Sequence, residues 1–155
     1  MRMSELYAVG EKAEIGSYTF TEENIVRFAT RYDPQRFHVD KEAAKDTLFG
    51  DLCASGWHTT AAWMRTFLAF WERQSAALAQ NGQTSPNLGP SPGFQKLQWL
   101  RPVFAGDVVS YSVAFLSSRA LASRPGWHLN TILCEGVNQN GHAVIRFESS
   151  VLEFG

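Results

Sequence analysis

The stretch YDPQRFHVD contains the two residues of this chain whose types and spacing most favour acid–base chemistry. Asp33 and His38 lie five positions apart. One is anionic and the other can titrate near neutral pH, as a general acid/base pair requires. Such a pair is also found on surface turns, where an aspartate accepts hydrogen bonds from backbone amides. Taken alone, the pair is compatible with a catalytic site and with a structural turn.

A second feature, in the segment CASGWHTT, could stabilise a negative charge. Gly56 stands at the expected start of a helix, where unpaired N–H groups and the positive end of the helix dipole are exposed. A glycine there would let a ligand carbonyl approach the backbone closely, as in an oxyanion hole. The alternative is that Ser55 caps the helix and Gly56 only relieves crowding.

The elements that must position these residues begin with a strand and two helices. KAEIGSYTF is strand-like, and a helix should follow it, capped by Thr21 and ended by Pro34, because the residue before a proline avoids the α region. The pair Asp33 and His38 then lies in a loop. Asp40 should cap a short helix, although an aspartate after a histidine could also bind a metal.

The segment SGWHTTAAWMRTFLAFWERQ is the strongest helix candidate. Its apolar residues recur at helical spacing all along it, which predicts a helix buried over much of its circumference. Most of these side chains should belong to the core, leaving one or two to line an apolar ligand channel. The predicted stripe comprises Trp57, Ala61, Met64, Leu68 and Trp71, widened by Trp63, Phe67 and Phe70.

The second half of the sequence is dominated by strand patterns. Residues Ala79 to Gly93 have loop composition and are numerous enough for a lid or a surface excursion. Four strand-like segments follow, and Asn140-Gly141 predicts a type I′ turn that joins the last two of them antiparallel. A strand, a long helix and four strands predict an α+β fold in which an antiparallel sheet covers one helix.

Composition excludes several classes of protein. The 155 residues fit a single domain, 1–155, and a net charge of -1 gives no electrostatic reason to expect nucleic acid or an anionic membrane as a partner. No apolar run suits a signal peptide or a membrane span, so we expect a cytoplasmic protein. Cys53 and Cys134 lack a CxxC spacing, and the four histidines lack metal-site spacing. We expect two buried, reduced thiols and no metal.

Three motifs in this order resemble the MaoC-like dehydratases, a hot-dog family that includes the (R)-specific enoyl-CoA hydratases. The family's Asp-x-Asn-Pro-aliphatic-His motif appears as DPQRFH, residues 33–38, with Ala44 at the small position that follows. LFGDLCASGWHT resembles its Phe-Gly segment before the central helix, and LRPVFAGDVV its Pro-Val-x-x-Gly-Asp turn. Three residues depart from the hydratase pattern: Gln35 replaces Asn, Arg36 replaces Pro, and Met64 stands where some hydratases carry a serine.

The resemblance implies a hot-dog fold and an enoyl-CoA hydratase, a lyase of fatty acid metabolism that reversibly adds water to a trans-2-enoyl-CoA. Asp33 and His38 would be the catalytic dyad, and the Gly56 amide would bind the thioester oxygen. The resemblance also implies an acyl-CoA partner, no cofactor beyond the coenzyme A of the substrate, and a homodimer or higher homo-oligomer.

Bulky and basic residues supply the substrate-binding candidates. Trp57, Trp63 and Phe67 could limit the acyl tail, and Trp57→Ala would then widen the chain-length preference. Arg36 and Arg101 are candidates for the phosphates of coenzyme A by charge alone.

Two other functions stay open. Hot-dog thioesterases commonly place an acid in the early turns of the central helix, whereas the first acid after Gly56 is Glu72, about four turns on. A non-catalytic acyl-CoA-binding role is compatible with the three departures from the hydratase pattern.

Overall fold

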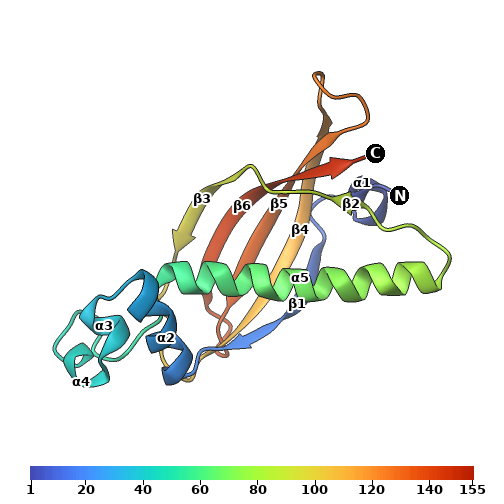
Figure 1. Ribbon diagram of the computed structural model, residues 1–155. Helices are drawn as coiled ribbons and strands as arrows, with labels where there is room; N and C mark the ends of the chain where they lie inside the picture. Colours follow the sequence, from blue (N-terminus) through green and yellow to red (C-terminus); the bar gives the residue numbers. More distant parts are fainter.

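The computed structural model describes residues 1–155 as a curled antiparallel sheet wrapped around one long helix (Figure 1). The helices are α1 (Met3–Leu6), α2 (Glu22–Tyr32), α3 (Arg36–Val39), α4 (Lys41–Ala44) and α5 (Gly56–Gln80). The strands are β1 (Lys12–Thr19), β2 (Asn87–Leu88), β3 (Gly93–Trp99), β4 (Val108–Ala120), β5 (His128–Val137) and β6 (Ala143–Phe154). The α+β arrangement expected from the sequence is confirmed.

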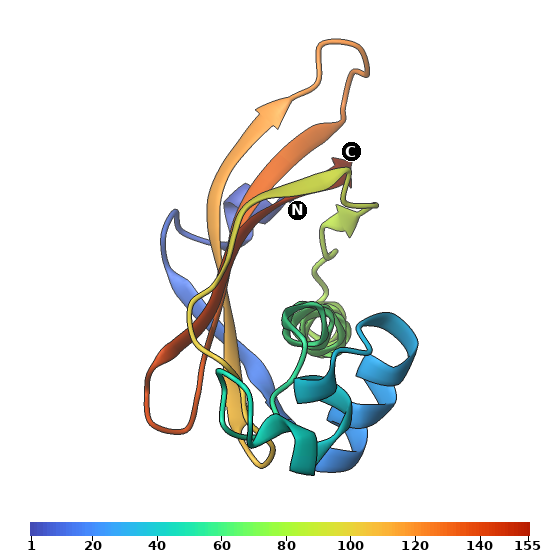
Figure 2. The same cartoon turned by 90° about the vertical axis from the view of Figure 1, so that its left-hand side faces the viewer.

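The sheet runs in the order β1-β4-β5-β6-β2, and β3 also pairs with β6. All these pairings are antiparallel. Viewed along α5, the strands curl around one side of the helix, and α2, α3 and α4 lie on the other side (Figure 2). They gather at the end where α5 begins (Figure 1). The first turn of α5 therefore lies near the segment that carries Asp33 and His38.

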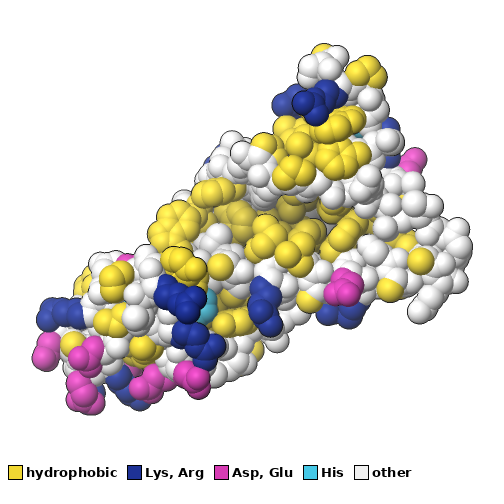
Figure 3. All heavy atoms as spheres, in the orientation of Figure 1, with side chains coloured by type: hydrophobic (Ala, Val, Ile, Leu, Met, Phe, Trp, Pro, Cys, Tyr) yellow, Lys and Arg dark blue, Asp and Glu magenta, His cyan; other side chains and the backbone are white.

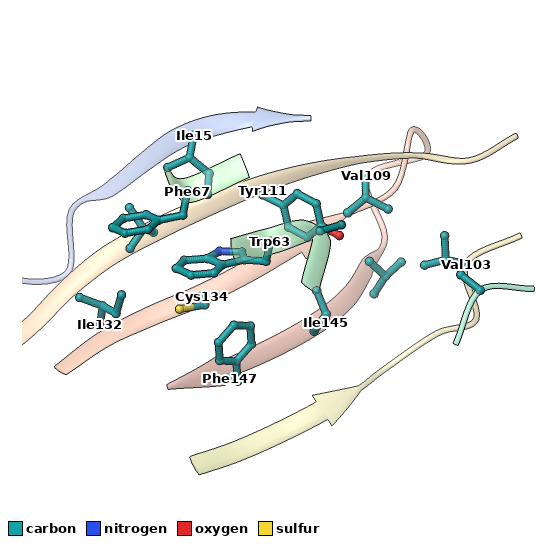
Figure 4. Packing of buried hydrophobic residues seen from close by; sticks show 14 of the residues in the cluster. Ile15, Trp63, Phe67, Val103, Val109, Tyr111, Ile132, Cys134, Ile145 and Phe147 are labelled. Carbon is teal, nitrogen blue, oxygen red and sulfur yellow. The ribbon is translucent and has the colours of Figure 1, made fainter. Parts of the chain in front are cut away.

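The core lies between the sheet and α5 (Figure 4). Trp63 and Phe67 of α5 stack on each other, with ring centroids 5.0 Å apart. Two hydrogen bonds then tie the helix to β4: Trp63 Nε1 donates to Ser112 O (3.1 Å), and the Tyr111 hydroxyl donates to Thr59 O (2.8 Å). These contacts set the rotation of α5 against the sheet, and with it the direction of its first turn.

Only one face of α5 is buried, so the expectation of burial over much of its circumference was wrong. Trp57, Met64 and Leu68, from the predicted stripe, are 50%, 42% and 58% exposed. The helix carries apolar side chains on more than one face, and periodicity alone cannot tell which of these faces meets the sheet. The buried positions are His58, Thr59, Ala62, Trp63, Phe67 and Leu78.

The segment from Ala79 to Gly93 contains regular structure as well as loop. Helix α5 continues to Gln80, beyond the predicted segment, and β2 pairs with the end of β6, Asn87 opposite Phe154. Backbone pairing to the sheet therefore anchors the middle of this connection.

The β5–β6 connection is antiparallel as predicted, but its turn is not of type I′. That type needs positive φ at both central residues. Gly141 has φ 78°, whereas Asn140 does not adopt a positive φ. Instead the Asn138 carboxamide oxygen accepts the N–H groups of Asn140 and His142, both at 3.0 Å, which stabilises a wider turn.

None of the helices combines the length and the apolar character needed to cross a membrane. Cys53 and Cys134 are both buried free thiols, as expected. Burial raises the pKa of Cys53 to about 11 and also raises that of Cys134, so both stay protonated at neutral pH.

Candidate active site

Backbone hydrogen bonds bring the three sequence motifs together. The Cys53 N–H donates to Phe37 O (3.1 Å), directly beside His38. The next residue, Ala54, donates its N–H to Val103 O (2.7 Å) in the Pro-Val-x-x-Gly-Asp turn. The segment before α5 is thus held between α3 and this turn, and the start of the helix is fixed near the histidine.

Asp33 and His38 face each other across a tight turn. Asp33 ends α2 as its C-cap, and His38 lies in the one-turn helix α3, so the expected loop contains a turn of helix. His38 Nε2 is 3.4 Å from Asp33 Oδ2, and the side chains are only 7% and 19% exposed. Gln35 Nε2 donates to the other carboxylate oxygen, Oδ1, at 2.7 Å. The Oδ2 atom therefore remains free to face the histidine.

The second nitrogen of His38 defines the protonation of the ring. Nδ1 lies 2.6 Å from the carbonyl oxygen of Cys53. Since a carbonyl can only accept, Nδ1 carries the proton, and Nε2 of the neutral ring has a free lone pair. That lone pair and the Asp33 carboxylate are both acceptors. A molecule with two O–H donors, such as water, is the complement of this pair.

The first N–H group of α5, that of Gly56, is free. Ser55 is the N-cap residue, but its buried hydroxyl makes no hydrogen bond, so it does not cap the helix as the structural alternative supposed. Gly56 is the first helical residue, and its N–H has no earlier turn to bond to. A free donor at the positive end of a 25-residue helix suits an oxygen that gains negative charge.

Packing gives a second reason for a glycine at position 56. A Cβ atom there would lie 2.3 Å from the indole ring of Trp99, at the end of β3. That indole also donates from Nε1 to Thr60 Oγ1 (3.2 Å) and meets Trp57 edge-on, with centroids 4.9 Å apart. Gly56 thus permits Trp99 to lie directly against the first turn of α5.

These groups share one cavity of about 370 Å³, which we call the catalytic cavity. Asp33 is its only carboxylate, and Arg101 is its only arginine or lysine. Half of the lining residues are hydrophobic, as is usual for small-molecule sites. The lining comprises Asp33, Gln35, Phe37, His38, Phe49, Cys53, Ala54, Gly56, Thr59, Trp99, Leu100, Arg101, Pro102 and Val103.

The other predicted binding residues lie elsewhere. Trp63 and Phe67 line a second cavity of about 290 Å³ between α5, the β2–β3 connection and the sheet, which we call the apolar cavity. Trp57 contacts Trp99 but lines neither cavity, and Arg36 is exposed outside both. Arg101 belongs to the catalytic cavity and to an adjoining polar cavity of about 260 Å³.

Two features of the site were missed by the sequence reasoning. The Cys53 carbonyl orients His38, although only the thiol of this residue was considered. Trp99 lines the catalytic cavity, although it was noted only as part of a strand. Neither residue type signals such a role, since a backbone carbonyl has no side-chain identity and strands commonly carry tryptophan.

His58 lies on the side of α5 away from the catalytic cavity. Its ring stacks on Phe28, with centroids 4.6 Å apart, and Phe20 meets it edge-on. Nε2 is 3.3 Å from the Tyr18 hydroxyl, whereas the buried Nδ1 has no partner. Burial lowers the pKa of His58 to about 4, so the ring is neutral at pH 7.

Asp40 has the capping role expected of it. Its Oδ1 accepts the N–H groups of Glu42 (3.0 Å) and Ala43 (3.1 Å) at the start of α4. The exposed side chain is thereby committed to the helix terminus.

Comparison with known proteins places the fold and the family. The model of the "MaoC like domain" family matches residues 6–124. The uncharacterized protein YdeM of Bacillus subtilis (strain 168) is 25% identical over 152 residues, 98% of each chain. The crystal structure of the MaoC-like dehydratase from Rhodospirillum rubrum is 31% identical, with a TM-score of 0.78, and the match covers 99% of this chain and 97% of that one.

A more distant structure shows how widely the fold is shared. The (R)-hydratase from A. caviae involved in PHA biosynthesis is 21% identical with a TM-score of 0.64, over 96% of this chain and 97% of that one. At this identity the likeness concerns the fold alone. These matches confirm the hot-dog fold, and because the family model covers more than half of its residues, the chain belongs to the MaoC-like domain family.

Proposed function

We propose that this protein is an enoyl-CoA hydratase, which reversibly adds water to a trans-2-enoyl-CoA thioester. The observation that carries the proposal is the convergence, in one cavity, of the Asp33–His38 pair and the uncapped start of α5. Hydration needs a base and acid beside a water, and a donor at the oxygen where charge develops. The site offers both. Membership of the MaoC-like family supports the same reaction class.

In the proposed reaction, Asp33 and His38 hold the water between their two acceptor atoms. The water oxygen bonds to the β carbon as the pair takes one of its protons, and the pair then returns a proton to the α carbon. The Cys53 carbonyl keeps the Nε2 lone pair of His38 directed at the water, because it binds the proton on Nδ1. Substrate and water supply every atom, so the scheme uses no cofactor beyond the coenzyme A of the substrate.

The Gly56 N–H would bind the thioester oxygen. During water addition the electrons of the double bond move toward this oxygen, which becomes enolate-like. A backbone donor fixed by the helix needs no reorganisation to bind that charge. Arg101, at the junction of the catalytic and polar cavities, is the cation best placed to meet the phosphates of coenzyme A.

We further propose that the active form is at least a homodimer. Exposed apolar side chains gather on α5 and β3, and Figure 3 shows hydrophobic atoms bordering the hollow between them. An exposed apolar surface of this kind marks an interface in many proteins. The side chains concerned are Trp57, Met64 and Leu68 of α5 and Phe94 and Trp99 of β3.

Incubation with crotonyl-CoA tests the function. Loss of the absorbance of the conjugated enoyl thioester, with 3-hydroxybutyryl-CoA as the product, is expected. Release of free thiol instead would identify a thioesterase, and binding without either reaction would identify an acyl-CoA-binding protein. The thioesterase is disfavoured because Glu72 is exposed and does not line the catalytic cavity.

A further inference from the structure

The catalytic and apolar cavities lie along one face of α5. The catalytic cavity uses Gly56 and Thr59 from the helix, and the apolar cavity uses positions 63, 64, 67, 68 and 71. These positions follow the three- and four-residue spacing of one helical stripe. Thr60 also belongs to this stripe, yet it lines neither cavity. It therefore marks the boundary between them.

Trp99 occupies that boundary. Its indole donates to Thr60 Oγ1 (3.2 Å), and its ring lies so close to Gly56 that a Cβ there would come within 2.3 Å. Trp57 packs edge-on against it from the next helical position. The indole is thus held by a hydrogen bond and by contacts to two residues of the first turn.

The backbone of β3 is shaped to place this side chain. Pairing with β6 shifts register between Gln95 and Gln98, which is a β-bulge. Within the bulge Lys96 adopts φ 55°, a left-handed conformation that is uncommon for a residue with a side chain. Bulges redirect the side chains that follow them. Pairing is regular again at Trp99, which lies opposite Ile145.

An acyl tail could leave this site along the apolar stripe of α5. The thioester oxygen is assigned to the Gly56 N–H, so a tail that follows the apolar stripe of α5 must pass Thr60. The apolar cavity beyond is lined mostly by hydrophobic residues, among them Met64, Phe67 and Leu68, and would suit a hydrocarbon chain. The indole of Trp99 lies at this point, bonded to Thr60 and against Gly56.

We propose that Trp99, held by Thr60, is a partition that restricts the enzyme to short enoyl groups, and that opening it admits longer chains to the apolar cavity. The inference rests on the proposed hydratase function. Trp99 acts here as a specificity-determining residue, because it contacts the space for the tail and none of the reacting atoms.

The test compares crotonyl-CoA with trans-2-octenoyl-CoA. The wild type should favour crotonyl-CoA in kcat/KM, and Trp99→Ala should raise the octenoyl-to-crotonyl ratio by about tenfold or more, as expected for methylenes that gain an apolar site. Thr60→Val keeps the size of the side chain but removes the acceptor, and Trp99→Phe removes the donor. Both should move the ratio in the same direction by less. Trp127→Ala, at the far end of the sheet against Phe154, controls for loss of a tryptophan.

A wild type that uses octenoyl-CoA as well as crotonyl-CoA would overturn the partition, as would an unchanged ratio in all three partition variants. Calorimetric binding of butyryl-CoA and octanoyl-CoA provides a readout that does not need turnover. If the wild type hydrates neither enoyl-CoA, the proposed function fails. The ratio of octanoyl-CoA to butyryl-CoA affinity, compared between Trp99→Ala and the wild type, still tests the partition. If Trp99→Ala does not fold, Thr60→Val and Trp99→Phe decide it.

Discussion

His38 and His58 lie on two sides of the first turn of α5, and their surroundings are opposite in character. His38 donates from Nδ1 to the Cys53 carbonyl, its Nε2 faces the Asp33 carboxylate, and the ring borders a cavity. His58 is packed among aromatic rings, and its Nδ1 has no partner. One ring lies at the site proposed for proton transfer, and the other is held neutral as part of the packing. The residue type alone therefore does not predict the role of a histidine here. The groups in contact with its two ring nitrogens distinguish the two cases.

Substitutions in the proposed acid–base pair should have the largest effect on activity and should distinguish His38 from His58. Asp33→Asn and His38→Gln should each lower kcat for crotonyl-CoA by roughly 10²–10⁴-fold, the usual contribution of a general acid or base. His58→Phe keeps an aromatic ring against Phe28 and should retain most of the activity. Steady-state kinetics, with circular dichroism to verify folding, measures this. Equal losses in His38→Gln and His58→Phe would erase the distinction.

Lowering the pH should reduce the folding stability because of the buried, neutral ring of His58. Its pKa is about 4 in the folded protein and near 6.5 when unfolded, so the unfolded state binds more protons between these values. Stability should therefore fall as pH drops from 7 through 6.5 toward 4, by about 2 kcal/mol at pH 4.5 from this group. His58→Phe should lose that part of the pH dependence.

Urea unfolding at several pH values measures the difference between wild type and His58→Phe. The subtraction removes the contribution of the carboxylates, which titrate in both proteins. Parallel pH profiles for the two proteins would show that His58 does not titrate as its burial implies.

The smallest expected effect concerns the residue that holds Asp33. Gln35→Leu removes the hydrogen bond to Asp33 Oδ1, which is worth about 1 kcal/mol, or roughly fivefold in kcat. Gln35→Asn keeps a carboxamide, the group of the hydratase motif, and should recover part of the loss. The loss should fall mainly on kcat, because Gln35 orients the carboxylate, and steady-state kinetics with crotonyl-CoA measures it. An unaltered kcat in Gln35→Leu would leave Gln35 without a positioning role.

The two cavities along α5 could not be predicted from the sequence. The periodicity of the helix identified the apolar residues but overestimated how many are buried, because tryptophan and leucine stand on both the buried and the exposed side. The strand patterns were correct because period-two alternation is a local property of the backbone. The hairpin was correct as a connection but wrong in turn type, since the Asn138 side chain competes with the backbone for the turn N–H groups.

The sequence by itself determined the α+β order of elements, the helix caps at Thr21 and Asp40, and the candidates Asp33, His38 and Gly56. Each of these follows from local chemistry within a few residues. Tertiary structure alone decided that the Cys53 carbonyl sets the tautomer of His38, that Ser55 leaves the helix uncapped, and that Trp99 lies against Gly56. Those contacts join residues up to 43 positions apart in the chain, as for Gly56 and Trp99. They exist only because the curled sheet and the helix pack against each other.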